Sequence, residues 1–565
     1  MVNLRENPFY LDDDAIRWVD QTKARLSLED KVGQLFCVCC RAGTEEEVNW
    51  IYSILNPGTV LLRQLSIQEG IAYNSFLDKH AKVPLLIAAN LEQGGDGIAA
   101  EGTCYGAPMA VAASGKVENA RMLGRIAGLE GREMGVNWAL APLVDIDYNW
   151  RSPIMNIRTF GGDPEQVRDM GRAYVEDVQK LGLAACPKHF PGDGRDERDQ
   201  HLLISVNDMS CEDWDRTYGE NYKACIDAGT LSIMIGHIML PSYERYFCPD
   251  MRDEDMLPAT LSPVLMKKLL REKLGFNGLI ATDATTMAGF IIPMDRAKAI
   301  PTTIANGADV LLMSRNLKED YAFMLEGVRN GIISSERLDE AVTRILATKA
   351  ALGLHKGKRT LSAEKAKAVI GCAAHRQTAK ALADEAVTLV KEEKGVLPIS
   401  PERYKKILLY PIETTEKAQG LTAANSAGDR IKTLLEKEGF EVDVYVPYTE
   451  MEGNIPPYKS ITEKYDLILY IANLVTKSNQ TVVRIEWKQP FGSNTPVYVN
   501  AVPTIFISVA NPYHLVDVPR VKTYVNAYSA NDETIEAVVE KLMGKQPFVG
   551  TSPVDPFCGK WDTRL

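Results

Sequence analysis

Titratable side chains are concentrated in one stretch of the sequence, residues 188–201. It holds two of the chain's seven histidines, four acidic residues, three other basic residues and two glycines. The apolar run at 183–187 that precedes it is typical of a buried strand. Polar loops that leave the ends of buried strands carry the catalytic groups of α/β enzymes, so this stretch is a candidate active-site loop. A solvated, salt-bridged surface loop is the alternative.

Within this loop, Asp199 and His201 are separated by one residue. A carboxylate at that spacing can hold an imidazole and select its tautomer, which suits a general acid and base. An exposed pair without a chemical role is the other interpretation.

A second acidic candidate, Asp283, directly follows the apolar run 279–282. A carboxylate at the end of a buried strand is costly unless it is paired or used. Capping of a following helix is its main structural alternative.

The elements around these residues indicate an N-terminal (β/α)8 barrel over residues 1–352. Short apolar runs alternate with helical patterns, and runs without polar alternation are typical of parallel, buried strands. Functional groups are therefore expected at the carboxyl ends of the strands. The strands are predicted at 31–38, 59–62, 85–89, 138–143, 183–187, 231–237, 279–282 and 309–313. Helices are predicted at 117–133, 164–181, 211–228, 263–274 and 335–352, among others.

Beyond a charged connector at 353–368, residues 369–565 predict a doubly wound α/β sandwich domain. After a helix at 373–385 and an apolar run at 386–390, the pattern gives strands at 405–410, 441–446, 466–471, 504–509 and 522–528, with helices at 424–438 and 533–543. No Gly-x-Gly-x-x-Gly sequence follows the first of these strands, so the pattern does not indicate a dinucleotide site.

Composition narrows the classes of partner. The 565 residues include 64 basic and 75 acidic ones, a net charge of −11, which argues against nucleic acid or an anionic membrane as the main partner. The ten cysteines form no Cys-x-x-Cys pair, so buried thiols are favoured over a metal site. With no apolar leader and no run of membrane-spanning length, a cytoplasmic protein is expected.

These motifs together resemble glycoside hydrolase family 3. The resemblance rests on 188–192, on Asp199 with His201, and on 275–283 followed by Met287 and Gly289. Within the family, the chain is most similar to the NagZ-like branch of β-N-acetylglucosaminidases. Supporting segments are 84–88 with 94–95, 141–145 with 158–161, 305–309 and 386–391.

The resemblance implies roles for the candidate residues. Asp283 would be the nucleophile that forms a glycosyl-enzyme ester with net retention, and His201, backed by Asp199, would be the acid and base. Lys188, His189 and Arg158 match positions that hydrogen-bond the sugar. His237 also matches a family histidine, although a satisfied core histidine is an equal alternative. Asp145 and Glu92 complete the expected substrate-binding set.

Three departures from the family pattern bear on the substrate. Asp193 stands where the family usually has histidine. Ala284 follows the expected nucleophile in place of a second carboxylate. The acidic residue that would hold the outer hydroxyls of the sugar is displaced, and Glu92 is the nearest candidate.

The expected protein is an exo-acting, retaining β-N-acetylglucosaminidase for small saccharides. It is expected to need no metal or organic cofactor, and a homodimer is a possible assembly. A β-glucosidase or another β-hexosidase of the same mechanism is the second hypothesis. A phosphorylase that transfers the sugar to phosphate is the third. A metal-dependent hydrolase built on Asp193, Asp196, Asp199 and the loop histidines, and a sugar-binding barrel without activity, are alternatives from other classes.

Overall fold

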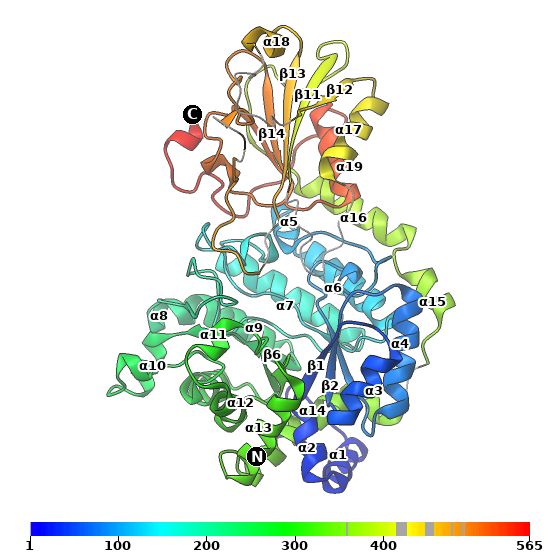
Figure 1. The fold of residues 1–565 in the computed structure, drawn as a ribbon, viewed down its shortest axis with the longest axis vertical. Helices are drawn as coiled ribbons and strands as arrows, with labels where there is room; N and C mark the ends of the chain where they lie inside the picture. Colours follow the sequence, from blue (N-terminus) through cyan, green and yellow to red (C-terminus); the bar gives the residue numbers. More distant parts are fainter. Residues whose placement is uncertain are drawn as a thin grey trace. The chain divides into compact units, whose positions relative to one another are not determined.

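The computed structural model describes residues 2–357, 360–413, 426–446, 457–475, 478–487, 489 and 492–565. The chain divides into two compact units (Figure 1). The barrel unit comprises residues 1–105, 120–149 and 163–375, and the sandwich unit comprises residues 106–119, 150–162 and 376–565. The segment 353–368, expected as a connector, lies within the barrel unit.

Parallel strands form the centre of the barrel unit. One sheet has the order β4-β3-β2-β1-β9, and β6 pairs with β8 in parallel. Single parallel bridges join Ala281 to Val310, Trp138 to Ala184 and Phe190 to Ile235, so the strand positions close into a ring of eight. The expectation of a (β/α)8 barrel is confirmed. The strands are β1 (Phe36–Cys40), β2 (Thr59–Leu62), β3 (Leu86–Ala89), β4 (Trp138–Ala139), β6 (Ser232–Ile235), β8 (Leu279–Thr282) and β9 (Leu311–Leu312).

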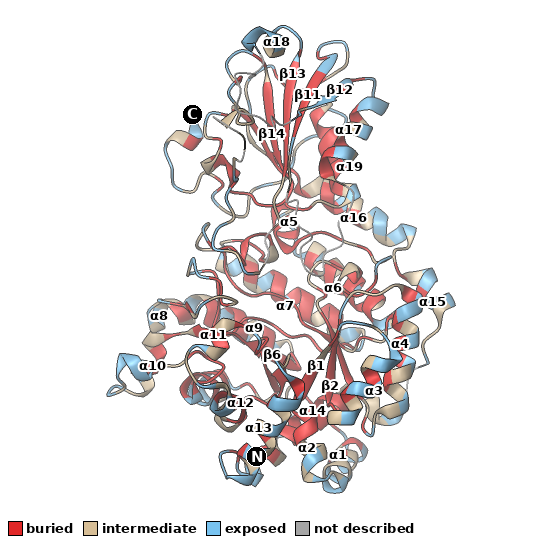
Figure 2. Ribbon diagram, in the orientation of Figure 1, coloured by how far each residue is buried: buried red, intermediate tan, exposed pale blue. Residues whose placement is uncertain are grey.

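Amphipathic helices surround these strands, with buried inner faces and exposed outer faces (Figure 2). Local signals begin several of them: Ser66 and Glu69 form a reciprocal capping box on α4, and Ser334 caps α14. The longer helices are α1 (Asp13–Arg25), α3 (Glu45–Ile54), α4 (Ile67–His80), α6 (Val117–Glu133), α7 (Pro164–Lys180), α12 (Arg296–Asn306), α13 (Leu317–Arg329) and α14 (Ser335–Ala351). None of the helices in the described part of the chain is long and apolar enough to span a membrane.

Several elements differ from the sequence prediction. The predicted strand 31–38 begins as helix α2 (Leu28–Gln34), because the Ser27 side chain caps it by accepting a hydrogen bond from the Asp30 backbone N–H. The run 183–187 joins its neighbours through single bridges instead of a continuous ladder. A small unpredicted pair, β5 (Ser205–Val206) and β7 (Ile238–Met239), lies next to the candidate loop.

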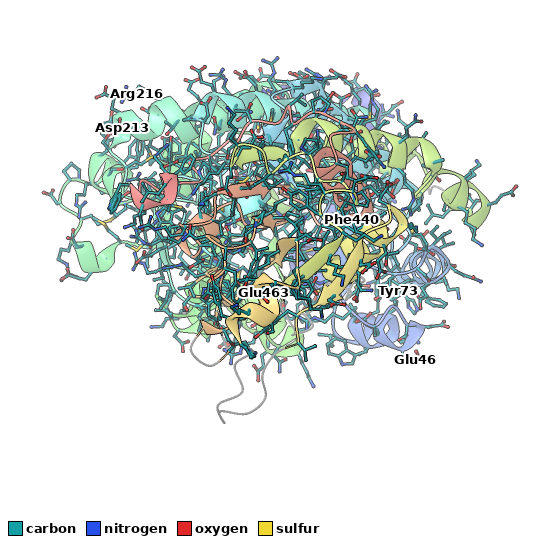
Figure 3. The ribbon with its side chains drawn as sticks, turned by 90° about the horizontal axis from the view of Figure 1, so that it is seen from above. Glu46, Tyr73, Asp213, Arg216, Phe440 and Glu463 are labelled. Carbon is teal, nitrogen blue, oxygen red and sulfur yellow. The ribbon has the colours of Figure 1, made fainter. Side chains whose placement is uncertain are left out.

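The predicted helix 211–228 is interrupted by a wider turn. It consists of α8 (Cys211–Trp214), the π-helical segment η3 (Asp215–Gly219) and α9 (Glu220–Asp227). Asp213 on α8 and Arg216 on η3, both labelled in Figure 3, form an exposed ion pair. Pairs of this kind contribute little to stability.

The sandwich unit contains one mixed sheet of the order β10-β15-β14-β13-β11-β12, in which only β10 runs antiparallel to its neighbour. Successive residues of β11 enter different clusters: Ile407 and Leu409 pack in one, Leu408 and Tyr410 in the other. Both faces of the sheet are therefore covered, and the predicted doubly wound α/β fold is confirmed. Its strands are β10 (Thr388–Lys391), β11 (Lys406–Glu413), β12 (Glu441–Val444), β13 (Leu467–Asn473), β14 (Thr504–Ser508) and β15 (Thr523–Asn526). Its main helices are α16 (Ala373–Ala386), α17 (Ala427–Lys437) and α19 (Asp532–Leu542).

Candidate active site

Asp283 lies directly beyond the carboxyl end of β8. Its backbone N–H donates to the Ile235 carbonyl at the end of β6 (2.8 Å), and its Oδ1 accepts from the Ala284 N–H (2.7 Å). The next helix, α11 (Ala288–Ile291), has Met287 at its cap, so Asp283 does not cap it. The side chain remains 13% exposed, enough for an atom of a bound molecule to reach it.

Histidines surround the Asp283 carboxyl. Burial opposes its ionisation, but the charges of His189, His237 and His201 outweigh that effect and hold the pKa of Asp283 below its usual value. Burial lowers the pKa of His237 to about 4. Asp283 is therefore a carboxylate, the form in which it can act as a nucleophile.

His189 connects Asp283 to a buried acid. Its Nδ1 contacts Asp145 Oδ2 (2.8 Å), and its Nε2 lies 3.8 Å from Asp283 Oδ2. Asp145 Oδ1 accepts from the backbone N–H groups of His189 (3.0 Å) and Asp193 (2.7 Å). The Asp145 side chain is completely buried, and these hydrogen bonds hold His189 and the loop that follows. Its expected role in substrate binding stays a prediction.

Lys188 and Glu92 form a second pair of predicted binding residues. Lys188 Nζ lies 2.7 Å from Glu92 Oε1, and both side chains are nearly buried. A cation and a carboxylate held together can donate to and accept from neighbouring sugar hydroxyls, and such charge-assisted hydrogen bonds are strong.

Asp199 and His201, the residues expected to act as the acid–base pair, are in contact. His201 Nδ1 contacts Asp199 Oδ1 at 2.7 Å, and the same oxygen accepts from the His201 backbone N–H (2.8 Å). Asp199 is fully buried, whereas His201 is 28% exposed. Because Asp199 accepts the Nδ1 proton, Nε2 is the ring atom that can exchange a proton with a substrate.

The loop carrying His201 rests on the segment after Asp283. The N–H groups of Ala288 and Gly289 donate to the carbonyls of His201 (3.0 Å) and Gln200 (3.2 Å). A Cβ at Gly289 would lie 2.7 Å from the Gln200 carbonyl oxygen, so only glycine permits this approach. The nucleophile and acid–base candidates thus lie on two loops that are hydrogen-bonded to each other.

His237 is fully engaged by the protein. Its Nε2 faces the Ala284 carbonyl (3.1 Å), so it carries the proton, and its Nδ1 faces the Thr260 hydroxyl (3.0 Å). The ring is buried. These contacts favour the structural alternative, in which His237 supports the backbone next to Asp283.

Arg158 belongs to the sandwich unit, where it ends the short helix η2 (Asn156–Arg158). Its Nη1 donates to the Ile154 carbonyl (3.1 Å). Its role in binding the sugar stays a prediction.

Two polar residues of the site were not predicted from the sequence. Thr260 holds His237 from 23 positions away, and nothing in the local sequence marks it. Gln200 lies between Asp199 and His201, and its side chain is buried. Within the described residues, no three His, Cys, Asp or Glu side chains form a group that could hold a metal ion, so the geometry gives no support to the metal-dependent alternative.

Asp193, the departure from the family pattern, is a buried acid without a cationic partner among its hydrogen bonds. Its oxygens face the Gly194 N–H, the Ser205 hydroxyl and the Gln200 amide. Burial raises the pKa of Asp193 to about 8, and the nearby charges of Asp145 and Asp199 add to the effect.

This pKa predicts a pH-dependent stability difference. From about pH 4 to about pH 8 the unfolded chain releases the Asp193 proton while the folded chain keeps it, so this group destabilises the fold progressively as the pH rises. The melting temperature of Asp193→Asn relative to wild type should therefore increase across that range and level off above it. A difference that does not change with pH would contradict the neutral carboxyl.

The chain is similar to known proteins along its whole length. The model described as "Glycosyl hydrolase family 3 N terminal domain" matches residues 27–348. A Cellulomonas fimi protein described as "Beta-N-acetylglucosaminidase/beta-glucosidase" is 48% identical over 565 residues, covering 100% of both chains. A structure described as "Beta-glucoside phosphorylase BglX" is 42% identical, covers 99% of both chains and superposes with a TM-score of 0.92.

A family 3 β-N-acetylglucosaminidase from Paenibacillus sp. str. FPU-7 is 23% identical, with a TM-score of 0.79 over 94% of this chain and 99% of that one, and supports the fold alone. The family model covers more than half of the chain, and the Cellulomonas fimi relative matches it from end to end. The chain is therefore an enzyme of glycosyl hydrolase family 3.

Proposed function

We propose that the protein cleaves a terminal, non-reducing β-N-acetylglucosaminide or β-glucoside with retention, using Asp283 as the nucleophile and His201 as the acid and base. The observation that carries the proposal is the pairing of an ionised carboxylate at one strand end with an Asp199-held imidazole on the adjoining loop. One group can form a covalent bond and the other can move a proton, as a double displacement requires.

In the first step, a carboxylate oxygen of Asp283 attacks the anomeric carbon while His201 Nε2 gives its proton to the departing oxygen. The glycosidic C–O bond breaks, the aglycone leaves as an alcohol, and the sugar remains as an ester on Asp283. In the second step, the neutral imidazole takes a proton from the acceptor as the acceptor attacks the same carbon. Two inversions give net retention, and Asp283 returns as a carboxylate.

The sugar itself is expected to lie against Lys188, Glu92 and His189. The Lys188–Glu92 pair (2.7 Å) offers one donor group and one acceptor group, and His189 lies between Asp145 and Asp283. Asp145 and His237 have the roles of positioning residues, since the described contacts occupy their polar atoms. N-acetylglucosamine and glucose are both proposed as substrates because the Cellulomonas fimi relative is named for both.

Phosphate is the second candidate acceptor. The full-length similarity to a protein described as a β-glucoside phosphorylase favours it. Electrostatics supports it as well: when His201 acts as the base it is neutral, so it repels an approaching phosphate anion less than a carboxylate base would.

The test is a panel of aryl β-glycosides that differ at C2 and C4, assayed with and without phosphate while the products are followed by NMR. We expect activity on N-acetylglucosaminides, glucosides or both, and a β-configured first product. A β-glycosyl phosphate would identify the phosphorylase reaction, and a phosphate-independent rate would identify hydrolysis. An α-configured first product would contradict the retaining mechanism.

A further inference from the structure

Gln200, the residue between the two members of the acid–base pair, connects three separate segments through its own groups. Its side-chain Oε1 accepts from the His237 backbone N–H (2.8 Å), and its Nε2 donates to Asp193 Oδ2 (3.1 Å). Its backbone carbonyl accepts from the Gly289 N–H (3.2 Å). Both Gln200 and Asp193 are almost completely buried.

These contacts permit only one orientation of the Gln200 amide. The His237 N–H can only donate, so the oxygen of the amide must face it, and the NH2 group must then face Asp193. Asp193 is the acceptor that keeps this NH2 group satisfied in a buried site. Without it, the amide would bury an unpaired donor directly beside His201.

Asp193 is itself fixed on several sides. Its backbone N–H donates to Asp145 Oδ1 (2.7 Å), its carbonyl accepts from the Tyr218 hydroxyl (2.7 Å), and its Oδ1 accepts from the Gly194 N–H (2.8 Å). The Ser205 hydroxyl on β5 lies 3.3 Å from the same oxygen. The side chain is thus a rigid support for Gln200.

We infer that Asp193 is a positioning residue that acts through Gln200 to hold the His201 loop in the geometry for proton transfer. The inference rests on the proposed role of His201 and adds a residue at the position where this chain departs from the family pattern. Asp193 needs no contact with the substrate for this role, because its effect passes through the Gln200 amide.

The carboxyl acts in its neutral form. The ionisable groups facing it are Asp145 on the segment after β4, Asp199 on its own loop and Tyr218 on η3, and none of these supplies a positive charge. Arg195, the nearest cation along the chain, is paired with the exposed Asp208. A neutral acid can accept from Gln200 with one oxygen and donate from the other to Ser205.

The test compares substrates that do and do not need a proton on the leaving group. For Asp193→Ala and Gln200→Leu, kcat/KM with a poor leaving group such as methoxyphenol should fall about tenfold to hundredfold, part of the contribution of general acid catalysis. With 2,4-dinitrophenol as the leaving group, the fall should be less than about threefold, since that group departs without protonation. The isosteric Asp193→Asn can still accept from Gln200 and donate to Ser205, but its NH2 group cannot accept from the Gly194 N–H, so it should give an intermediate ratio. It also provides a folded variant if the alanine variant is unstable.

Two controls separate positioning from general damage. Asp208→Asn, which changes an exposed carboxylate paired with Arg195, should leave both rates unchanged. In a His201→Ala background, adding Asp193→Ala should not change the ratio of kcat/KM between the two leaving groups any further, because both substitutions act on the same proton transfer.

Equal losses on both leaving groups, or losses that multiply in the double variant, would overturn the inference. If His201→Ala alone lowers kcat/KM equally for both leaving groups, the proposed acid–base role of His201 is wrong. This result differs from those that would overturn the role of Asp193, so the two proposals are tested separately.

Discussion

Replacing Asp283 with Asn is expected to lower kcat/KM by about 10⁴-fold or more on every substrate, the order of loss found when a covalent nucleophile is removed. The amide is nearly the same size as the carboxylate, and its oxygen can still accept from the Ala284 N–H, so the loop should stay folded. The loss would therefore report the chemistry and not the packing. It is measured with the dinitrophenyl glycosides, whose departure needs no acid.

A stronger form of this experiment uses Asp283→Gly with added azide. The space left by the carboxylate admits the anion, which attacks the same face of the sugar and gives an α-glycosyl azide from a β-substrate. The partly exposed pair Lys31–Asp339 offers a matched control, since Asp339→Asn alters a carboxylate on α14 that pairs with α2, the helix before β1. If Asp283→Asn retains more than about one tenth of the wild-type rate, another residue is the nucleophile.

Much of the scaffold could be predicted from the sequence because parallel buried strands appear as uninterrupted apolar runs. β2 and β8 begin and end where the runs 59–62 and 279–282 do. The strand predicted at 31–38 was wrong in its first part because Ser27 caps a helix there. A cap depends on one side chain, which the hydropathy pattern does not reveal.

The residues expected to act in catalysis and binding could also be predicted from the sequence, because Asp199, His201, Lys188 and His189 lie within fourteen consecutive residues. The residues that hold them in place could not be predicted. Thr260 and Gln200 reach His237 from other segments of the chain, and Gln200 reaches Asp193 from seven positions away on its own loop. These contacts depend on how the loops fold together, so no local pattern of the sequence predicts them.

The division of the chain into the barrel and sandwich units could not be fully predicted from the sequence either. Residues 106–119 and 150–162 continue the barrel in sequence but belong to the sandwich unit. Ala107, for example, donates its backbone N–H to the Ser529 hydroxyl (2.8 Å), more than four hundred positions away. Periodicity reports whether a segment is buried but not against which element it packs.

His201→Ala is expected to have the second largest effect, and its pattern differs from that of Asp283. Loss of the proton donor should lower kcat/KM by about 10²- to 10⁴-fold for poor leaving groups and far less for dinitrophenol. With activated substrates the glycosyl-enzyme should accumulate, because the base for the second step is also missing. A burst of dinitrophenol followed by a slow steady rate would show this.

Azide should then restore the steady rate of His201→Ala, because an anionic nucleophile needs no base. It would attack the Asp283 ester and give a β-glycosyl azide, the opposite anomer to that expected from Asp283→Gly. Asp199→Asn should show the same pattern with a smaller loss, since the amide can still accept from the His201 ring (2.7 Å in wild type) but carries no charge to stabilise an imidazolium. If azide gives no acceleration in either variant, or if both azide products have the same configuration, the assignment of Asp283 and His201 to opposite faces of the sugar is wrong.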